Sequence, residues 1–207
     1  KSYLICIFSF HLYYKIIFSI VIFSFLIIPL LIIFFYLSLK GLGYLFCQYF
    51  YKNNTIHQSI YPLAIMPAIF FLLTVIHFFT KISPYLNLIL FVGGFIIYLM
   101  KIRKNENKLL FLIILVTITI QFYGHDVNED FGYYHLPYII NFVSDKLIIG
   151  LSHLSMAQGH NSAWLNTSSF FYLPFFFEKS IHFSNSVLFF SILFFYLSFL
   201  FKNKNLI

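Results

Sequence analysis

Long runs of apolar residues, separated by short polar stretches, form the main pattern of this 207-residue chain. A helix through the roughly 30 Å hydrocarbon core of a bilayer needs about 20 residues, and five runs reach or approach that length. They cover residues 16–39, 63–79, 85–100, 109–122 and 186–201. The pattern therefore predicts an all-α, polytopic transmembrane protein.

The region between the last two of these runs has a different pattern. Over residues 136–147, apolar residues recur at helical spacing with polar residues mostly opposite, which is typical of a helix that lies along the membrane interface. The apolar run 164–177 would reach only about 21 Å as a helix, which is too short for an unaided span. We interpret it as a half-inserted helix. The alternative, that it spans, would leave the basic tail (202–204) outside.

These segments divide the chain into three parts. Residues 1–122 would form the N-terminal transmembrane helices, 123–184 a large loop with two juxtamembrane helices and an acidic motif, and 185–207 a return helix with a basic tail. The 101–108 loop carries four basic residues against one acid, so the positive-inside rule assigns it to the cytoplasm. The large loop would then face the periplasm or exterior. Because the sequence starts with Lys1 and stops just after a predicted span, we expect it to be a fragment of a longer protein.

Composition narrows the class of protein further. The 61% hydrophobic and 9% charged content excludes an ordinary soluble domain, and the bilayer is the expected partner. The net charge of +7 lies mainly between the apolar runs, where it orients the chain, so we expect no nucleic-acid partner. The abundance of residues with AT-rich codons fits a bacterium with an AT-rich genome, and we therefore expect the protein in the bacterial inner (cytoplasmic) membrane. The two cysteines have no metal-ligand spacing, and a disulfide framework is not expected.

The acidic stretch after the fourth run is the main candidate for chemistry. Asp126, Glu129 and Asp130 are three of the six carboxylates in the chain. Like charges this close favour a shared proton or a bound cation, so a divalent cation could be held there. A carboxylate in such a site could also remove a proton from an acceptor hydroxyl. The alternative interpretation is a solvated loop without a function.

Aromatic and imidazole groups accompany these acids. Tyr134 and His135 follow directly and could bind a sugar or a phosphate, although tyrosine is also common at membrane interfaces. In the next polar stretch, His153 and His160 could line a donor site, with His160 contacting a phosphate. Asn161 is equally suited to cap the following helix. No spacing among these histidines matches a zinc signature.

The order of these motifs resembles a known family. An acidic residue before Tyr-His-Leu-Pro (134–137), an amphipathic helix, Gly-Leu-x-His-Leu (150–154) and Gly-His-Asn-Ser-x-Trp (159–164) are similar to sequences of bacterial polytopic membrane proteins related to GT-C glycosyltransferases. The resemblance covers about residues 126–170. It implies a GT-C-like fold and transfer of a sugar from a polyprenyl-phosphate donor to an envelope glycan or lipid acceptor on the outer face of the membrane.

The resemblance also implies roles for individual residues. The expected catalytic residues are Asp130, Asp126 and Glu129. The expected substrate-binding residues are Tyr134, His135, His153, His160 and Asn161. Asp130 best matches the acidic position that acts as catalytic base in this family. The chain departs from the family in having four predicted spans before the loop, where many members have one, and in His153, where relatives often have Asn. Two alternatives stay open: a carrier or flippase component for lipid-linked substrates, and a non-catalytic membrane fragment.

Overall fold

The computed structural model describes residues 27–51, 57–102, 107–123, 135–148, 163–175 and 178–202. All regular secondary structure in these ranges is helical. Four of the helices are long and apolar enough to cross a membrane. The prediction of an all-α fold is therefore confirmed for this part of the chain, and the four long apolar helices support the prediction of a polytopic membrane protein.

In chain order the elements are a first helix (Ile27–Phe50), η1 (Gln58–Ile60), α2 (Tyr61–Phe79), α3 (Pro84–Lys101), α4 (Lys108–Tyr123), α5 (Leu136–Ser144), α7 (Ala163–Phe171), η4 (Glu178–His182) and α8 (Phe183–Lys202). Proline lies in the first turn of α2, α3 and α5. A proline at this position costs no helical hydrogen bond, because the first N–H groups of a helix have no partner within it.

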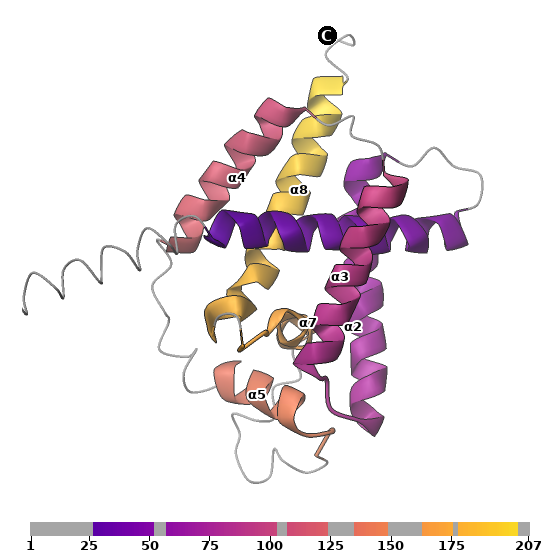
Figure 1. The fold of residues 1–207 in the computed structure, drawn as a ribbon, viewed down its shortest axis with the longest axis vertical. Helices are drawn as coiled ribbons and strands as arrows, with labels where there is room; N and C mark the ends of the chain where they lie inside the picture. The colour runs from indigo at the N-terminus through magenta and orange to yellow at the C-terminus, as the bar shows by residue number, and fades with distance from the viewer. Residues whose placement is uncertain are drawn as a thin grey trace, which may run out of the picture.

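The helices have two main directions (Figure 1). Helices α2, α3 and α8 run roughly along the long axis and α4 runs obliquely from one end to the middle, whereas the first helix runs across the molecule. The end of α3, the start of α4 and the end of α8 lie together at one end, and α5 lies at the other. The exposed Lys101 and Lys108 thus belong to the end opposite α5.

Small residues allow the first helix to cross its neighbours closely. A Cβ atom added at Gly41 would overlap the carbonyl oxygen of Gly94 on α3, and one added at Gly94 would overlap that of Ser38. A Cβ at Gly43 would likewise overlap the carbonyl oxygen of Tyr61 at the start of α2. Glycine is required here because backbone meets backbone, as is common where helices pack in membranes.

Aromatic rings fill the space around this crossing. The ring of Phe35 on the first helix lies 4.7 Å from that of Phe91 on α3, measured between centroids. It also lies 5.4 Å from the ring of Phe171 on α7 and 5.2 Å from that of Phe183 on α8. Aromatic pairs at such distances contribute about 0.5–1.5 kcal/mol each beyond their area burial. One side chain therefore links three helices to the first.

The first helix corrects one expectation from the sequence. We expected a helix to end at Leu39 and a polar connection to begin at Lys40, but the helix continues to Phe50. Lys40 lies inside this helix and is only 1% exposed. The folded protein accommodates its charge because Nζ lies 5.6 Å from the centre of the Tyr98 ring. An aromatic face attracts the ammonium group and offsets part of its desolvation. The earlier part of the expected helix, residues 16–26, lies outside the described residues.

The other long helices agree with the sequence patterns. The apolar runs 63–79, 85–100, 109–122 and 186–201 correspond to α2, α3, α4 and α8, and each helix extends beyond its run by at most three residues at either end. Helix α4 has 16 residues. It is therefore about 24 Å long, shorter than an unaided span requires.

The two shorter helices differ from expectation in length and surroundings. Helix α5 ends at Ser144 rather than near residue 147, and its buried side carries Ile139 and Phe142. Helix α7 has nine residues and ends at Phe171, not Phe177. At about 14 Å it is too short to span a bilayer. It lies within the bundle rather than along its surface, and α2, α3, α5 and α8 pack around it.

Candidate functional site

Most of the predicted site residues lie outside the part of the chain that the structure describes. These are Asp126, Glu129, Asp130, Tyr134, His153, His160 and Asn161. His135 is described: its side chain is exposed, and it directly precedes α5 with helical backbone angles. The roles assigned to these residues therefore stay predictions. The acidic stretch leads into α5 and the histidine-containing stretch leads into α7, so the contacts of these two helices fix the points where the two stretches end.

A hydrogen bond joins the first turns of α5 and α7. Tyr138 donates from its hydroxyl to Oδ1 of Asn166 over 2.9 Å. Tyr138 lies three residues after His135, and Asn166 lies three residues after Ala163, where the chain enters α7. The two helices that directly follow the predicted motifs thus begin side by side. Burial raises the pKa of Tyr138, so its hydroxyl stays protonated and able to donate at neutral pH.

Helix α7 is the polar centre of the bundle. Its four consecutive polar residues are all at least 94% buried: Asn166, Thr167, Ser168 and Ser169. Such groups need hydrogen-bond partners when they leave water. Nδ2 of Asn166 donates to Oγ1 of Thr74 on α2 over 3.3 Å, and the hydroxyls of Ser168 and Ser184 lie 2.9 Å apart. The Ser169 hydroxyl donates to the Asn166 carbonyl oxygen over 2.6 Å.

Asn87 of α3 contacts the same centre but is only half satisfied. Its Nδ2 donates to the carbonyl oxygen of Ser169 over 3.3 Å, and its side chain is fully buried. The other amide atom, Oδ1, has no hydrogen-bond partner among the residues that the structure describes. An unsatisfied buried acceptor costs about 1–3 kcal/mol, so Asn87 is a poor choice for stability alone. Among the polar residues around α7, Asn87 is therefore the best suited to accept a hydrogen bond from a ligand.

A second contact holds α2 to α5 at the end of the molecule where α5 lies. The ring of His77 on α2 lies over that of Phe142 on α5, with 3.5 Å between centroids. The Nε2 atom of His77 is 3.0 Å from the carbonyl oxygen of Asp145, and the N–H of Leu147 donates to the His77 carbonyl oxygen over 2.9 Å. Both ends of α5 are thereby fixed to the bundle, one by α7 and the other by α2.

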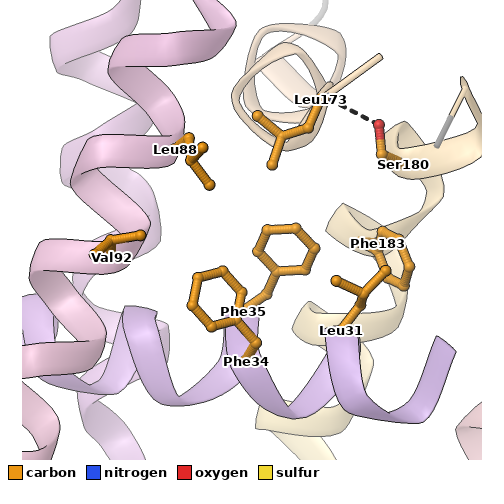
Figure 2. A pocket seen from close by; sticks show the side chains of 8 residues that line it. All are labelled: Leu31, Phe34, Phe35, Leu88, Val92, Leu173, Ser180 and Phe183. Carbon is orange, nitrogen blue, oxygen red and sulfur yellow. Dashed lines mark hydrogen bonds between the residues drawn. The ribbon is translucent and has the colours of Figure 1, made fainter. Parts of the chain in front are cut away.

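An apolar cavity of about 340 Å³ lies beside the polar centre (Figure 2). Its wall is formed by Leu31, Phe34 and Phe35 of the first helix, Leu88 and Val92 of α3, Leu173 after α7, Ser180 of η4 and Phe183 of α8. The Ser180 hydroxyl oxygen accepts a hydrogen bond from the backbone N–H of Leu173 over 2.8 Å, drawn as a dashed line. The volume falls in the range of about 300–1,000 Å³ that ligand pockets have.

Metal binding has no geometry to support it in the described ranges. No three His, Cys, Asp or Glu side chains come together there as a metal site would need. Cys47 is a buried free thiol of the first helix, and the other cysteine, Cys6, lies outside these ranges. A cation at the acidic stretch stays a prediction from the sequence.

The buried polar run of α7 is the feature that the sequence interpretation missed. Asn166, Thr167 and Ser168 match a glycosylation pattern, but such matches are frequent by chance. Their position was the informative signal. Successive residues of a helix point in different directions, so four consecutive polar residues are all shielded from lipid only if other helices surround that segment.

Comparison with known proteins adds no relative. The chain matches no protein-family model, no curated protein and no solved structure. Its function must therefore be argued from its own residues.

Proposed function

We propose that this protein is an integral membrane glycosyltransferase-like enzyme that moves a sugar from a polyprenyl-phosphate donor to an envelope glycan or lipid acceptor. The observation that carries the proposal is the junction of α5 and α7. The acidic stretch leads into α5 at His135, the histidine-containing stretch leads into α7 at Ala163, and the Tyr138–Asn166 hydrogen bond holds the two helix starts together. An acid from one stretch and a phosphate-binding group from the other can then serve one reaction centre.

Each participating group has a defined role in the proposed reaction. Asp130 takes the proton from the acceptor hydroxyl, and the acceptor oxygen attacks the anomeric carbon of the donor sugar. The bond from that carbon to the phosphate oxygen breaks, and polyprenyl phosphate leaves with the electron pair. Asp126 or Glu129 orients Asp130 or shares a cation with it. His135 and His160 contact the donor phosphate, and helix N-termini next to them favour negative charge.

The expected orientation in the membrane fits this chemistry. Lys101 and Lys108 are exposed at the end of the molecule opposite α5. Lysines next to spans favour the cytoplasmic side. The 101–108 loop has four basic residues in its sequence, against the exposed Lys81 and Lys146 beside α5, so α5 and the acidic stretch would face the periplasm or exterior. Lipid-linked sugars used outside the cytoplasm are presented on that face.

The test is sugar transfer by the full-length protein in proteoliposomes, supplied with a panel of radiolabelled polyprenyl-phosphate sugars and a membrane-envelope acceptor extract. Because a general base contributes about 10²–10⁴-fold, Asp130→Asn should lower transfer at least about a hundredfold. The matched control is Asp145→Asn, since Asp145 is an exposed carboxylate at the end of α5. Transfer by Asp130→Asn at the wild-type rate would refute the assignment of the base.

A carrier or flippase component for lipid-linked substrates is the second candidate. It is favoured by the buried polar centre, because polar side chains inside a membrane bundle often mark a substrate pathway. A flip assay with a fluorescent polyprenyl-phosphate sugar separates the two functions. A transferase leaves the probe on its original leaflet, whereas a carrier moves it, and Asn166→Ala should slow that movement while Asp130→Asn need not.

A further inference from the structure

We infer that the cavity between the first helix, α3 and α8 holds one acyl chain of a phospholipid from the surrounding bilayer. This inference is independent of the proposed function. It rests on the chemistry of the wall, on the volume of the cavity and on the side from which a ligand can enter. Each of these points to hydrocarbon rather than to water or a polar metabolite.

The wall offers nothing for water to bind. Seven of the eight lining residues are Leu, Phe or Val, and the eighth, Ser180, is 2% exposed with its oxygen bonded to the Leu173 N–H. A buried water needs two to four polar partners, and apolar cavities of the protein interior stay dry and accept apolar ligands. At about 340 Å³ the space is more than ten times the roughly 30 Å³ of a water molecule in the liquid. It is large enough for a stretch of hydrocarbon chain.

The entrance lies on the lipid side of α3. Val92 lines the cavity and is also 42% exposed. Ile89 and Ile96, within one turn of it on the same helix, are 65% and 49% exposed. Figure 2 shows Val92 and Leu88 projecting from α3 toward the two phenylalanines of the first helix. A chain that enters past Val92 therefore comes directly from the bilayer, where phospholipid acyl chains are the surrounding medium.

The far side of the cavity is closed, which makes it suitable as a reporter. Leu173 lines the cavity, follows α7 and is only 1% exposed. Leu173 is therefore shielded from the outer surface of the bundle, and a lipid that labels it must have entered the cavity. By comparison, Leu112 on α4 is 54% exposed, and Leu39 on the first helix is fully buried away from this wall.

Photo-crosslinking tests the inference. The full-length protein is expressed with photo-leucine in place of leucine, irradiated in its native membrane, digested and analysed by mass spectrometry. Fragment-ion spectra that assign the added mass to single leucines should place a phospholipid on Leu173 and on Leu112, and none on Leu39. An unlabelled Leu173 beside a labelled Leu112 overturns the inference. A polyprenyl-phosphate mass on Leu173 overturns the choice of occupant.

A bulky side chain placed at the entrance of the cavity, with a matched variant outside it, provides the second test. Val92→Trp should reduce phospholipid labelling of Leu173 at least about tenfold and leave Leu112 labelling unchanged. Ile96→Trp places the same indole one turn away on the same lipid-facing side, outside the cavity wall, and should leave both signals unchanged. Equal Leu173 labelling in the two variants overturns the proposed route. Leu88→Phe, which narrows the cavity from a half-buried position, should repeat the effect of Val92→Trp if that variant does not fold.

Discussion

Two adjacent glycines of α3 give the sharpest test of how the first helix crosses the bundle. A Cβ added at Gly94 would overlap the carbonyl oxygen of Ser38 and lie 2.8 Å from Cγ of Leu42, both on the first helix. A Cβ added at Gly93 would meet nothing within 4 Å. The variants Gly94→Ala and Gly93→Ala therefore add the same methyl group to the same helix, against another backbone in one case and into open space in the other.

The expected effects differ in sign. Replacing glycine by alanine in a helix interior is worth about 0.8–1.0 kcal/mol, and both variants receive this gain. Gly94→Ala additionally forces two helices apart, and overpacking of this kind costs about 1–3 kcal/mol. A carbonyl oxygen cannot turn away as a flexible side chain can, so the upper half of that range is expected. Gly93→Ala should be neutral to stabilising by about 1 kcal/mol, and Gly94→Ala should be less stable than Gly93→Ala by about 2–3 kcal/mol.

The assay is equilibrium unfolding of the purified protein in mixed micelles by increasing SDS. Fluorescence of Trp164, the only tryptophan of the chain, reports on α7, and circular dichroism reports on total helix. Since the propensity gain is common to both variants, the difference between their unfolding free energies isolates the steric cost at the crossing. Equal stabilities, within about 0.5 kcal/mol, would refute the close approach of the first helix to α3.

Three further predictions concern the polar centre and the membrane orientation. Asn87→Leu should be neutral to stabilising by about 1 kcal/mol in the same unfolding assay, because it removes an unsatisfied buried acceptor and also the hydrogen bond from Nδ2 to the Ser169 carbonyl oxygen. A loss of sugar transfer in that variant would indicate that Asn87 contacts a substrate, and a clearly destabilised variant would contradict the reasoning. A double-mutant cycle of Tyr138→Phe and Asn166→Ala should give a coupling of about 0.5–1.5 kcal/mol, and no coupling would mean that their hydrogen bond contributes nothing. In a cysteine-free background, Asp130→Cys in intact cells should react with a membrane-impermeant maleimide while Lys108→Cys should not, and the reverse pattern would place the acidic stretch in the cytoplasm.

The regular part of this fold could be predicted because lipid imposes a simple pattern. Positions of α3 that face lipid are apolar, as are most of those that face the core. The apolar run from Tyr85 to Met100 therefore marks the helix almost to its ends. The same reasoning failed at Lys40, because a charge was taken to end the span, whereas Tyr98 lies against it in the folded protein.

The hydrophobic pattern could not predict the direction of each helix or the helices that it packs against. An apolar run is equally compatible with a helix that follows its neighbours and with one that crosses them, and the glycines that decide this are informative only as a pair from distant segments, Gly41 and Gly94. The polar run of α7 likewise acquires its partners from residues as remote as Thr74, 92 positions earlier in the chain. The candidate acids were chosen from their spacing and resemblance, and Asp126, Glu129 and Asp130 stay predictions.

The enclosure of α7 has a consequence for how the protein is made. A nine-residue segment with four polar side chains is too short and too hydrophilic for the translocon to release into lipid as it emerges. We expect it to stay at the membrane surface until α8 has been synthesised, since Ser184 of α8 supplies one of its partners. Its integration would then follow the insertion of the helices that surround it.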